Sequence, residues 1–217
     1  MYDMKHLIPL IAVLTLLTLG LVFFVVPPAE GLGYYVRIIF LHIPCAWVSV
    51  VAFAVAAIYA WRVLRLRDGD RATLLRADGF SARSAQLGLL FTVLATVTGA
   101  IFSRLTWGAF WNWDPRQTTI LCLLMIYAAY LALRAVLDDP ERRARISAIY
   151  ALFSVLPVPF LVFVIPRFYF SLHPEPVLNS AGHIDMEPVM LATLLLALLD
   201  VTLIYFALLR KGAKSRT

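Results

Sequence analysis

The sequence has few charged residues for its length. Of its 217 residues, 15% are Asp, Glu, Lys or Arg and 62% are hydrophobic, whereas soluble domains contain about 25% charged and about 45–50% apolar residues. This composition excludes an ordinary soluble domain. It also excludes intrinsic disorder, because disordered chains are poor in apolar residues. The chain is therefore expected to be an integral membrane protein.

Cysteine is also scarce. Cys45 and Cys122 lie in separate apolar stretches, and no C-x-x-C motif occurs. A zinc ribbon and a thioredoxin-like dithiol both need such paired cysteines, so neither is expected. The sequence also lacks the G-x-x-x-x-G-K-[ST] motif of nucleotide-binding loops, so any ATP hydrolysis linked to this protein would belong to a partner.

Long apolar runs are what the sequence has in abundance. A transmembrane helix needs about 20 mostly apolar residues, and continuous runs rather than alternating residues favour helices over a barrel. The six predicted spans are Leu7–Val26, Ile38–Trp61, Ser84–Ser103, Gln117–Leu133, Ile146–Pro166 and Pro188–Leu209. We predict an all-α fold, a polytopic membrane protein whose six transmembrane helices and short loops form a single domain over residues 1–217.

The positions of the basic residues predict the orientation. The chain has 19 Lys and Arg against 13 Asp and Glu, but in a membrane protein basic residues mark cytoplasmic loops rather than a nucleic-acid partner. Only four of them fall on the side opposite the termini, namely Arg37, Arg104, Arg116 and Arg167. Both termini and two Arg-rich loops are therefore predicted in the cytoplasm. Those loops could also offer a docking face for cytoplasmic proteins.

The outer loop at about residues 104–117 is rich in tryptophan. Four aromatic rings lie within seven residues, those of Trp107, Phe110, Trp111 and Trp113. An interfacial aromatic belt is the simplest explanation, but a belt needs only one or two aromatic residues per helix end. Planar rings at this density suit a large, flat, apolar ligand.

The same loop ends in the sequence Asp114-Pro115-Arg116-Gln117. This order is typical of a helix N-cap followed by Pro at the first helical position and Gln at the third, so Asp114 could be a cap and nothing more. Arg116 would lie in the first turn, where the helix dipole favours anions over cations. A guanidinium held there indicates a carboxylate partner, which a ligand could supply.

A family signature coincides with this loop. Residues 107–118, WGAFWNWDPRQT, resemble the tryptophan-rich WWD signature of haem-handling proteins in cytochrome c biogenesis. Six spans and just over 200 residues are similar to the small CcmC (haem exporter protein C) family, since CcmF-like and CcsA-like members have further spans or large soluble parts. Residues 37–47, RIIFLHIPCAW, are similar to the segment that opens the family's second span. The resemblance runs over most of the chain.

The histidines fit the same resemblance. His42 lies about one turn inside the second span, where an ionisable group indicates function unless it is a neutral imidazole bonded to a neighbouring helix. His173 follows the fifth span and, alone, could be a solvated loop residue. Together, two imidazoles from separate segments can ligate haem iron axially. The family implies histidines at these two positions, and His183 remains a rival for the second.

The resemblance implies a set of binding residues. The predicted haem-binding residues are His42, His173, Trp107, Trp111, Trp113, Asp114, Arg116 and Arg37. In this set His42 and His173 would be the metal ligands, the tryptophans a platform for the macrocycle, and Arg116 a clamp on a propionate. Arg37 and Arg104 could each pair with a propionate or merely anchor the chain at the interface.

The resemblance also implies the function. It predicts a haem-handling protein of the bacterial inner membrane, not an enzyme, that holds haem at the periplasmic face and delivers it to the haem chaperone CcmE. The haem would be b-type and in transit, as the resemblance implies, and non-covalent, because the chain has no C-x-x-C-H motif. The implied partners are the ABC-type subunits CcmA and CcmB and the small protein CcmD.

Two other functions stay open at this stage. A haem b-type electron-carrier subunit usually has histidines deep in paired spans, and only His42 is predicted inside a span. A permease that moves haem across the membrane would need interrupted helices and central polar residues. Pro157 and Pro159 do interrupt the fifth span, and Asp200 is a carboxylate within the sixth, with no partner that the sequence can name.

Overall fold

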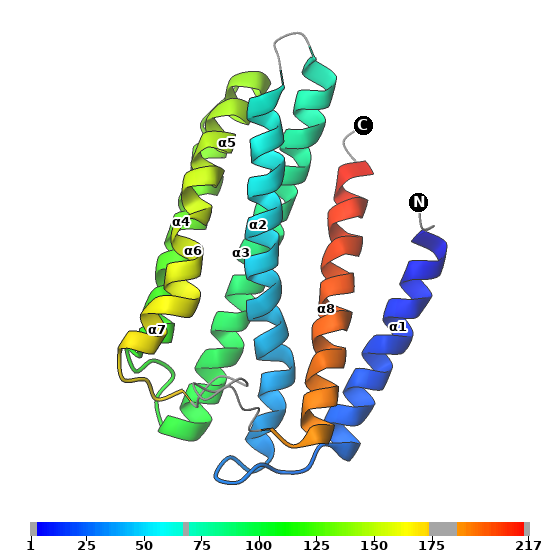
Figure 1. The fold of residues 1–217 in the computed structure, drawn as a ribbon, viewed down its shortest axis with the longest axis vertical. Helices are drawn as coiled ribbons and strands as arrows, with labels where there is room; N and C mark the ends of the chain where they lie inside the picture. Colours follow the sequence, from blue (N-terminus) through cyan, green and yellow to red (C-terminus); the bar gives the residue numbers. More distant parts are fainter. Residues whose placement is uncertain (1–3, 67–69, 174–185, 215–217) are drawn as a thin grey trace.

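The computed structural model describes residues 4–66, 70–173 and 186–214, which form a bundle of long helices (Figure 1). Six helices in this part of the chain are long and apolar enough to cross a membrane, which confirms the predicted all-α, six-span architecture. The elements are α1 (Met4–Gly20), η1 (Leu21–Val25), η2 (Tyr34–Ile38), α2 (Ile39–Arg65), α3 (Arg71–Trp107), α4 (Pro115–Ala135), α5 (Pro140–Val155), α6 (Pro157–Pro159), η3 (Phe160–Val164), α7 (Ile165–Phe168) and α8 (Pro188–Lys214).

The third span is longer than the hydropathy pattern predicts. Its helix begins at Arg71 rather than near Ser84, so most of the expected Arg-rich loop is helical. The extension packs against another span: Asp78 is buried and forms a bidentate ion pair with Arg134 of α4, with N–O distances of 2.6 and 2.7 Å. Two parallel hydrogen bonds satisfy both buried charges. A helix that carries charged residues can therefore continue while packed against its neighbour.

The fifth span is one helical run with a local irregularity. Pro157 and Pro159 lie inside it, and a π-helical turn follows at Phe160–Val164 before the chain resumes α-helix in α7. Proline removes a backbone donor and displaces the preceding turn, and π-turns absorb such mismatches within a helix. The predicted interruption is therefore a bulge and not a break.

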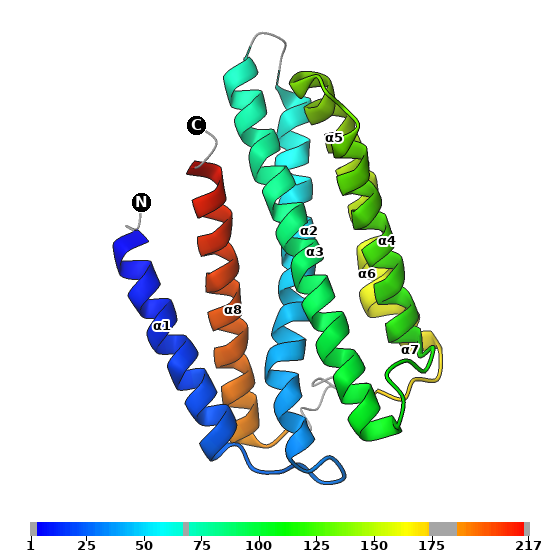
Figure 2. The same ribbon diagram turned by 180° about the vertical axis from the view of Figure 1, so that it is seen from behind.

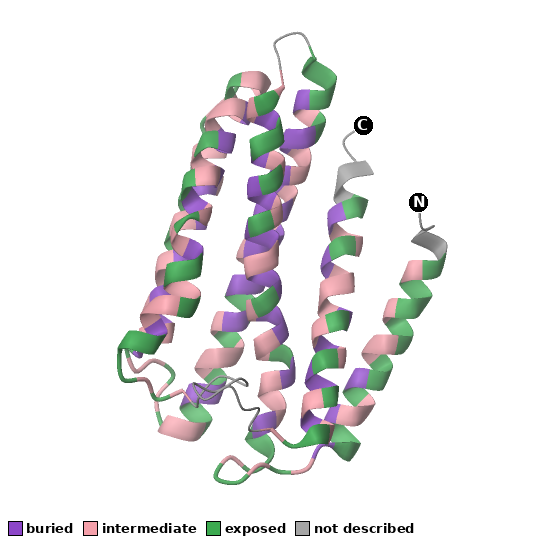
Figure 3. Ribbon diagram, in the orientation of Figure 1, coloured by how far each residue is buried: buried purple, intermediate pink, exposed green. Residues whose placement is uncertain are grey.

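The centre of the bundle is the α2–α3 pair, whose buried residues follow the length of both helices (Figure 3). Small residues bring the two backbones close together, as is common in membranes. The Ser84 hydroxyl donates to the Ala52 carbonyl at 2.6 Å and lies 2.7 Å from the Tyr205 hydroxyl of α8. A Cβ on Gly88 would lie 2.5 Å from the ring of Phe53, so this position accepts nothing larger than glycine without a shift.

The first span lies at the edge of the bundle beside α8 (Figures 1 and 2). It supplies the partner that the sequence could not name for Asp200. The Thr15 hydroxyl of α1 lies 3.1 and 2.9 Å from the two carboxylate oxygens of Asp200, which is buried.

The bundle has two chemically different ends (Figure 2). The Arg-rich end carries the start of α1, the end of α2, the start of α3, the α4–α5 turn and the end of α8. The tryptophan end carries the α3–α4 loop, the connection between η1 and α2, and residues 169–173 after α7. Functional residues gather on loops held by a rigid scaffold, and those predicted from the sequence lie at the tryptophan end.

Candidate functional site

A cavity of about 150 Å³ lies at the tryptophan end, lined by residues of α2, α3, the α3–α4 loop, α4, η3, α7 and the chain after α7. Four predicted residues line it: His42 from α2, Trp111 from the α3–α4 loop, Arg116 from α4 and His173 from the segment after α7. Most of the remaining lining is small or apolar. Residues far apart in the sequence therefore converge on one space.

His42 is held against α3 through one ring nitrogen. Its Nδ1 lies 2.9 Å from the carbonyl oxygen of Ala95 and 3.2 Å from the Thr98 hydroxyl oxygen. A carbonyl only accepts hydrogen bonds, so the bond requires the proton on Nδ1, which leaves a lone pair on Nε2. Among the described residues, Nε2 of His42 has no hydrogen-bond partner.

Gly99 makes room for this imidazole. It lines the same cavity, and a Cβ at this position would lie 2.9 Å from Cε1 and 3.3 Å from Nδ1 of His42. Gly99 was not among the residues predicted from the sequence. A glycine inside an apolar helix was the available signal, because such a residue often marks a close approach.

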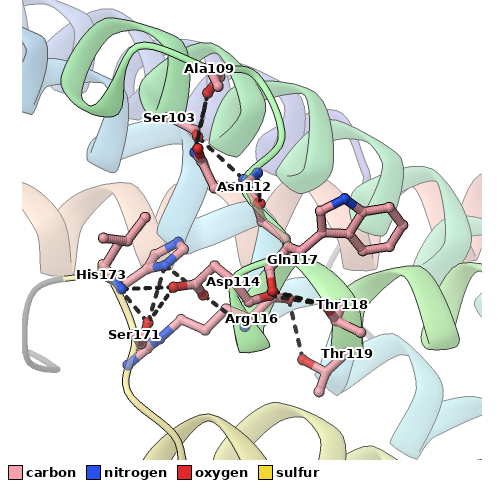
Figure 4. Close-up of polar contacts among 12 residues, drawn as sticks. Ser103, Ala109, Asn112, Asp114, Arg116, Gln117, Thr118, Thr119, Ser171 and His173 are labelled. Carbon is pink, nitrogen blue, oxygen red and sulfur yellow. Dashed lines mark hydrogen bonds and ion pairs between the residues drawn. The ribbon is translucent and has the colours of Figure 1, made fainter.

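His173 is oriented in the same way by a different acceptor. Its Nδ1 lies 3.0 Å from Oδ1 of Asp114, and its ring meets that of Trp107 edge-to-face, with centroids 5.0 Å apart. In Figure 4 the ring reaches toward Asp114 from the segment that also carries Ser171. With the proton on Nδ1, Nε2 of His173 is again a free acceptor within the part of the chain that the structure describes.

Asp114 does more than cap a helix. It is the N-cap of α4, accepting a hydrogen bond from the Arg116 amide at 2.9 Å, and Pro115 occupies the first turn as the sequence predicts. Its other oxygen accepts from the Ser171 hydroxyl at 2.8 Å and the Leu172 amide at 2.7 Å. Asp114 therefore fastens the segment that carries His173 to the start of α4 (Figure 4).

The charge states of this pair follow from the same contacts. Burial raises the pKa of Asp114, but its hydrogen bonds and the nearby His173 outweigh burial and hold the pKa below its usual range. Burial lowers the pKa of His173; Asp114 opposes this, Arg116 and His42 add to it, and the pKa is about 4. At neutral pH the pair is thus a carboxylate and a neutral imidazole.

Arg116 presents a cation to the cavity. Its side chain lines the space beside His173, and its buried Nε has no hydrogen-bond partner. Among the described residues no carboxylate forms an ion pair with its guanidinium. Since a buried guanidinium favours a bidentate acid partner, this group is suited to a carboxylate brought by a ligand.

The three tryptophans take different positions and do not form one stack. Trp107 ends α3 and contacts His173, whereas Trp111 lines the cavity. Trp113 is 70% exposed and meets Trp111 edge-to-face at 6.0 Å. Its φ of 56° lies in the left-handed region, which is uncommon for a residue with a side chain and accompanies functional loops.

A polar network that the sequence analysis missed folds the α3–α4 loop (Figure 4). The Asn112 side-chain amide donates to the Ser103 hydroxyl oxygen at 2.7 Å, and Ser103 donates to the Ala109 carbonyl at 2.7 Å. The Gln117 side chain was expected to cap α4, but its oxygen instead accepts a hydrogen bond from the backbone N–H of Asn112 at 2.7 Å. These bonds hold the tryptophans in place.

Arg37 is not brought to the cavity. Its guanidinium donates to the Phe23 carbonyl at 2.9 Å and lies 4.3 Å from the centre of the Tyr34 ring, so it packs the connection between the first two spans. Arg104 likewise lies over the Phe110 ring, 5.9 Å from its centre. His183 falls outside the described residues.

The buried pair predicts how His173 responds to acid. We expect its imidazole to remain neutral on acidification to about pH 4. Between pH 6.5 and 4 an unfolded chain would bind the proton that the folded site excludes, so the docked segment loses stability as the pH falls through this window. Histidine NMR of the detergent-solubilised protein, assigned with His173→Ala, measures the midpoint. A midpoint near 6.5 would contradict the burial and pairing described above.

Comparison with known proteins gives one consistent family. The model of the family described as CcmC, "Heme exporter protein C", matches residues 3–216. "Heme exporter protein C" of Bradyrhizobium diazoefficiens is 31% identical over 176 residues, covering 81% of this chain and 64% of the relative. The protein of the same name from Escherichia coli (strain K12) is 33% identical over 155 residues, covering 70% of this chain and 60% of the relative.

A protein described as mitochondrial is similar as well. A "cytochrome c biosynthesis ccmC-like mitochondrial protein" of Marchantia polymorpha is 31% identical over 176 residues, covering 80% of this chain and 72% of the relative. The matches thus span less than two thirds of the two bacterial relatives. Because the family model covers nearly every residue, the chain belongs to the CcmC, or haem exporter protein C, family.

Proposed function

We propose that this protein handles haem for cytochrome c biogenesis, binding it at the tryptophan end between His42 and His173. One observation carries the proposal: two imidazoles from separate elements line one cavity, and each is held through Nδ1 so that Nε2 is free. The family supports the identity of the ligand, since its members are named for haem export.

The surroundings of both histidines suit axial ligation. Haem supplies an iron that binds imidazole nitrogen at its axial positions. A metal-binding histidine usually donates its other N–H to a carbonyl or carboxylate, which fixes the ring and raises its basicity. Ala95 provides the carbonyl for His42, and Asp114 provides the carboxylate for His173. The neutral state of His173 keeps its Nε2 lone pair available.

The charged and aromatic side chains of the site suit the propionates and the macrocycle of haem. The Arg116 guanidinium, whose buried Nε has no hydrogen-bond partner among the described residues, would bind a haem propionate. The faces and edges of Trp107 and Trp111 would contact the macrocycle. Arg37 is proposed as an anchor of the outer turn and not as a propionate contact, because it pairs with Phe23 and Tyr34 instead.

The size of the cavity favours handling over storage. At about 150 Å³ it is smaller than an ordinary ligand pocket of roughly 300–1,000 Å³, so a porphyrin would extend beyond it. The neighbouring surface offers the exposed aromatic rings of Phe110, Trp113 and Phe170, which are 59%, 70% and 88% exposed. A ligand with an exposed edge can be passed to another protein.

We propose the tryptophan end as the periplasmic face, with both termini in the cytoplasm of a bacterial cell. The basic residues support this orientation, since they concentrate at the Arg-rich end. Haem held there, b-type and non-covalent, would be delivered to the chaperone CcmE, and CcmA, CcmB and CcmD would complete the exporter. In this role the chain binds and orients haem and makes no covalent bond.

The rival functions have less support from the geometry. An electron carrier would hold haem between paired helices, whereas His173 follows α7 and lies outside the helical spans. A permease with a charged central site has no support from Asp200, because its buried carboxylate accepts hydrogen bonds from the Thr15 hydroxyl.

Absorption spectra of the purified protein, made together with its proposed partners, test the ligand assignment. We expect His42→Ala and His173→Ala each to remove or shift most of the Soret band, because each variant deletes one iron ligand. His6→Ala is the matched control, since this histidine lies in α1 near the Arg-rich end, and it should leave the spectrum unchanged. A wild-type protein without haem would overturn the proposed function, and loss of the band in His183→Ala but not in His173→Ala would overturn the ligand pair.

Gly99 provides a test of positioning that leaves both ligands in place. In Gly99→Ala the new Cβ would meet the His42 ring at 2.9 Å, so the ring must turn or move away. We expect haem affinity to fall about 10- to 100-fold, the range seen when groups that orient a metal ligand are lost. Gly79→Ala, on the same helix with nothing within 4 Å of its Cβ, should bind like the wild type. Equal affinities for the two variants would show that the His42 geometry is irrelevant to binding.

A further inference from the structure

A second cavity, of about 570 Å³, lies between α2 and α3 at the Arg-rich end. We call it the arginine groove, after Arg62, Arg65 and Arg76, which line it together with Tyr59 and Phe80. Its other described lining residues are Leu66, Thr73 and Ala77, so the described walls carry three positive charges and no negative one.

Two aromatic rings, those of Tyr59 and Phe80, form what we call the aromatic floor of the groove, and arginine side chains line its sides. The rings of Tyr59 and Phe80 stack with centroids 4.8 Å apart and an interplanar angle of 14°. The Arg62 guanidinium lies 4.9 Å from the centre of the Tyr59 ring, and that of Arg65 lies 4.7 Å from the centre of the Trp61 ring. Such cation–π contacts hold a guanidinium plane and leave its N–H donors free.

The carboxylates described around the groove are engaged elsewhere. Asp78 pairs with Arg134 at 2.6 Å, and Glu141 pairs with Arg71 at 3.2 Å. Asp70 caps α3 by accepting from the Thr73 amide. Within the described residues none of the three groove arginines forms an ion pair. The positive-inside rule accounts for arginines at this end, but not for three of them converging on one unbalanced cavity.

The depth of the groove is set by the helices themselves. At about 1.5 Å per residue, Tyr59 lies roughly 26 Å along α2 from His42, and Arg65 lies roughly 35 Å from it. On α3, Arg76 lies roughly 35 Å from Gly99, which contacts His42. Because the hydrocarbon core is about 30 Å thick, a bundle with His42 at one interface puts the aromatic floor at the opposite boundary and the arginines among the headgroups.

We propose that the arginine groove binds the headgroup of an anionic phospholipid from the leaflet at the Arg-rich end. Guanidinium groups bind phosphate oxygens through paired donors, and basic pockets between transmembrane helices are recognised sites for anionic headgroups. The aromatic floor at the edge of the hydrocarbon core favours a lipid over a soluble anion, since only a lipid places apolar chains against it.

Native mass spectrometry of protein released from nanodiscs tests this site, using phosphatidylglycerol as a minor component in phosphatidylcholine. The wild type should retain phosphatidylglycerol, and Arg62→Gln/Arg76→Gln should bind it at least about tenfold more weakly, since losing a direct hydrogen bond between charged groups weakens binding roughly tenfold or more. The control Arg142→Gln/Arg210→Gln removes the same charge from exposed positions outside the groove and should stay within about twofold of the wild type. If the groove variant does not fold, Arg76→Gln alone should weaken binding about tenfold.

Three results would overturn the proposal. Equal losses in the groove and control variants would mean that only overall charge attracts the lipid. Equal retention of phosphatidylcholine and phosphatidylglycerol by the wild type would remove the headgroup preference. Displacement of the lipid by millimolar inorganic phosphate would assign the groove to a soluble anion. The haem-binding proposal is unaffected by any of the three.

Discussion

The candidate site depends on the carboxylate of Asp114. It is buried and accepts hydrogen bonds from the Arg116 amide, the Ser171 hydroxyl, the Leu172 amide and the His173 ring. Hydrogen bonds to a charged group contribute about 1.5–3 kcal/mol each. Asp114 thereby joins the first turn of α4 to the chain after α7, and it sets the tautomer of His173. Asp114, the N-cap of α4, therefore also determines which ring nitrogen of His173 faces the cavity, although the two residues are far apart in the sequence.

His42 and His173 are held in place by different kinds of contact. His42 sits on the α2–α3 pair, where serine hydroxyls bond directly to backbone carbonyls and Gly99 leaves space for the ring. His173 sits on a segment held by side-chain bonds to one carboxylate. A histidine fixed within the bundle therefore faces one whose segment is held by a few polar bonds. The exposed rings of Trp113 and Phe170 border that segment's side of the site.

The sequence was sufficient for the spans because apolar runs report directly on the membrane. It was also sufficient for the cap at Asp114, which is a local pattern. It could not give the Asp114–His173 contact or the Thr15–Asp200 contact, since each joins residues of separate elements whose pairing depends on packing. The start of α3 at Arg71 was missed for a related reason: hydropathy does not detect a helix whose charges are neutralised by another helix. The sequence also left open whether Arg37 faces the site or anchors the interface, because residue type does not give the direction of a side chain, which in the structure lies against Phe23 and Tyr34.

The central claim is that His42 and His173 ligate one haem iron from opposite sides. Electron paramagnetic resonance of the ferric, haem-loaded protein tests this most directly, because two strong axial imidazoles make the iron low-spin. The account predicts a low-spin signal for the wild type and a high-spin signal for either single-histidine variant, with the low-spin signal restored by added imidazole. A high-spin wild type, or a low-spin signal that persists in His173→Ala without imidazole, would contradict it.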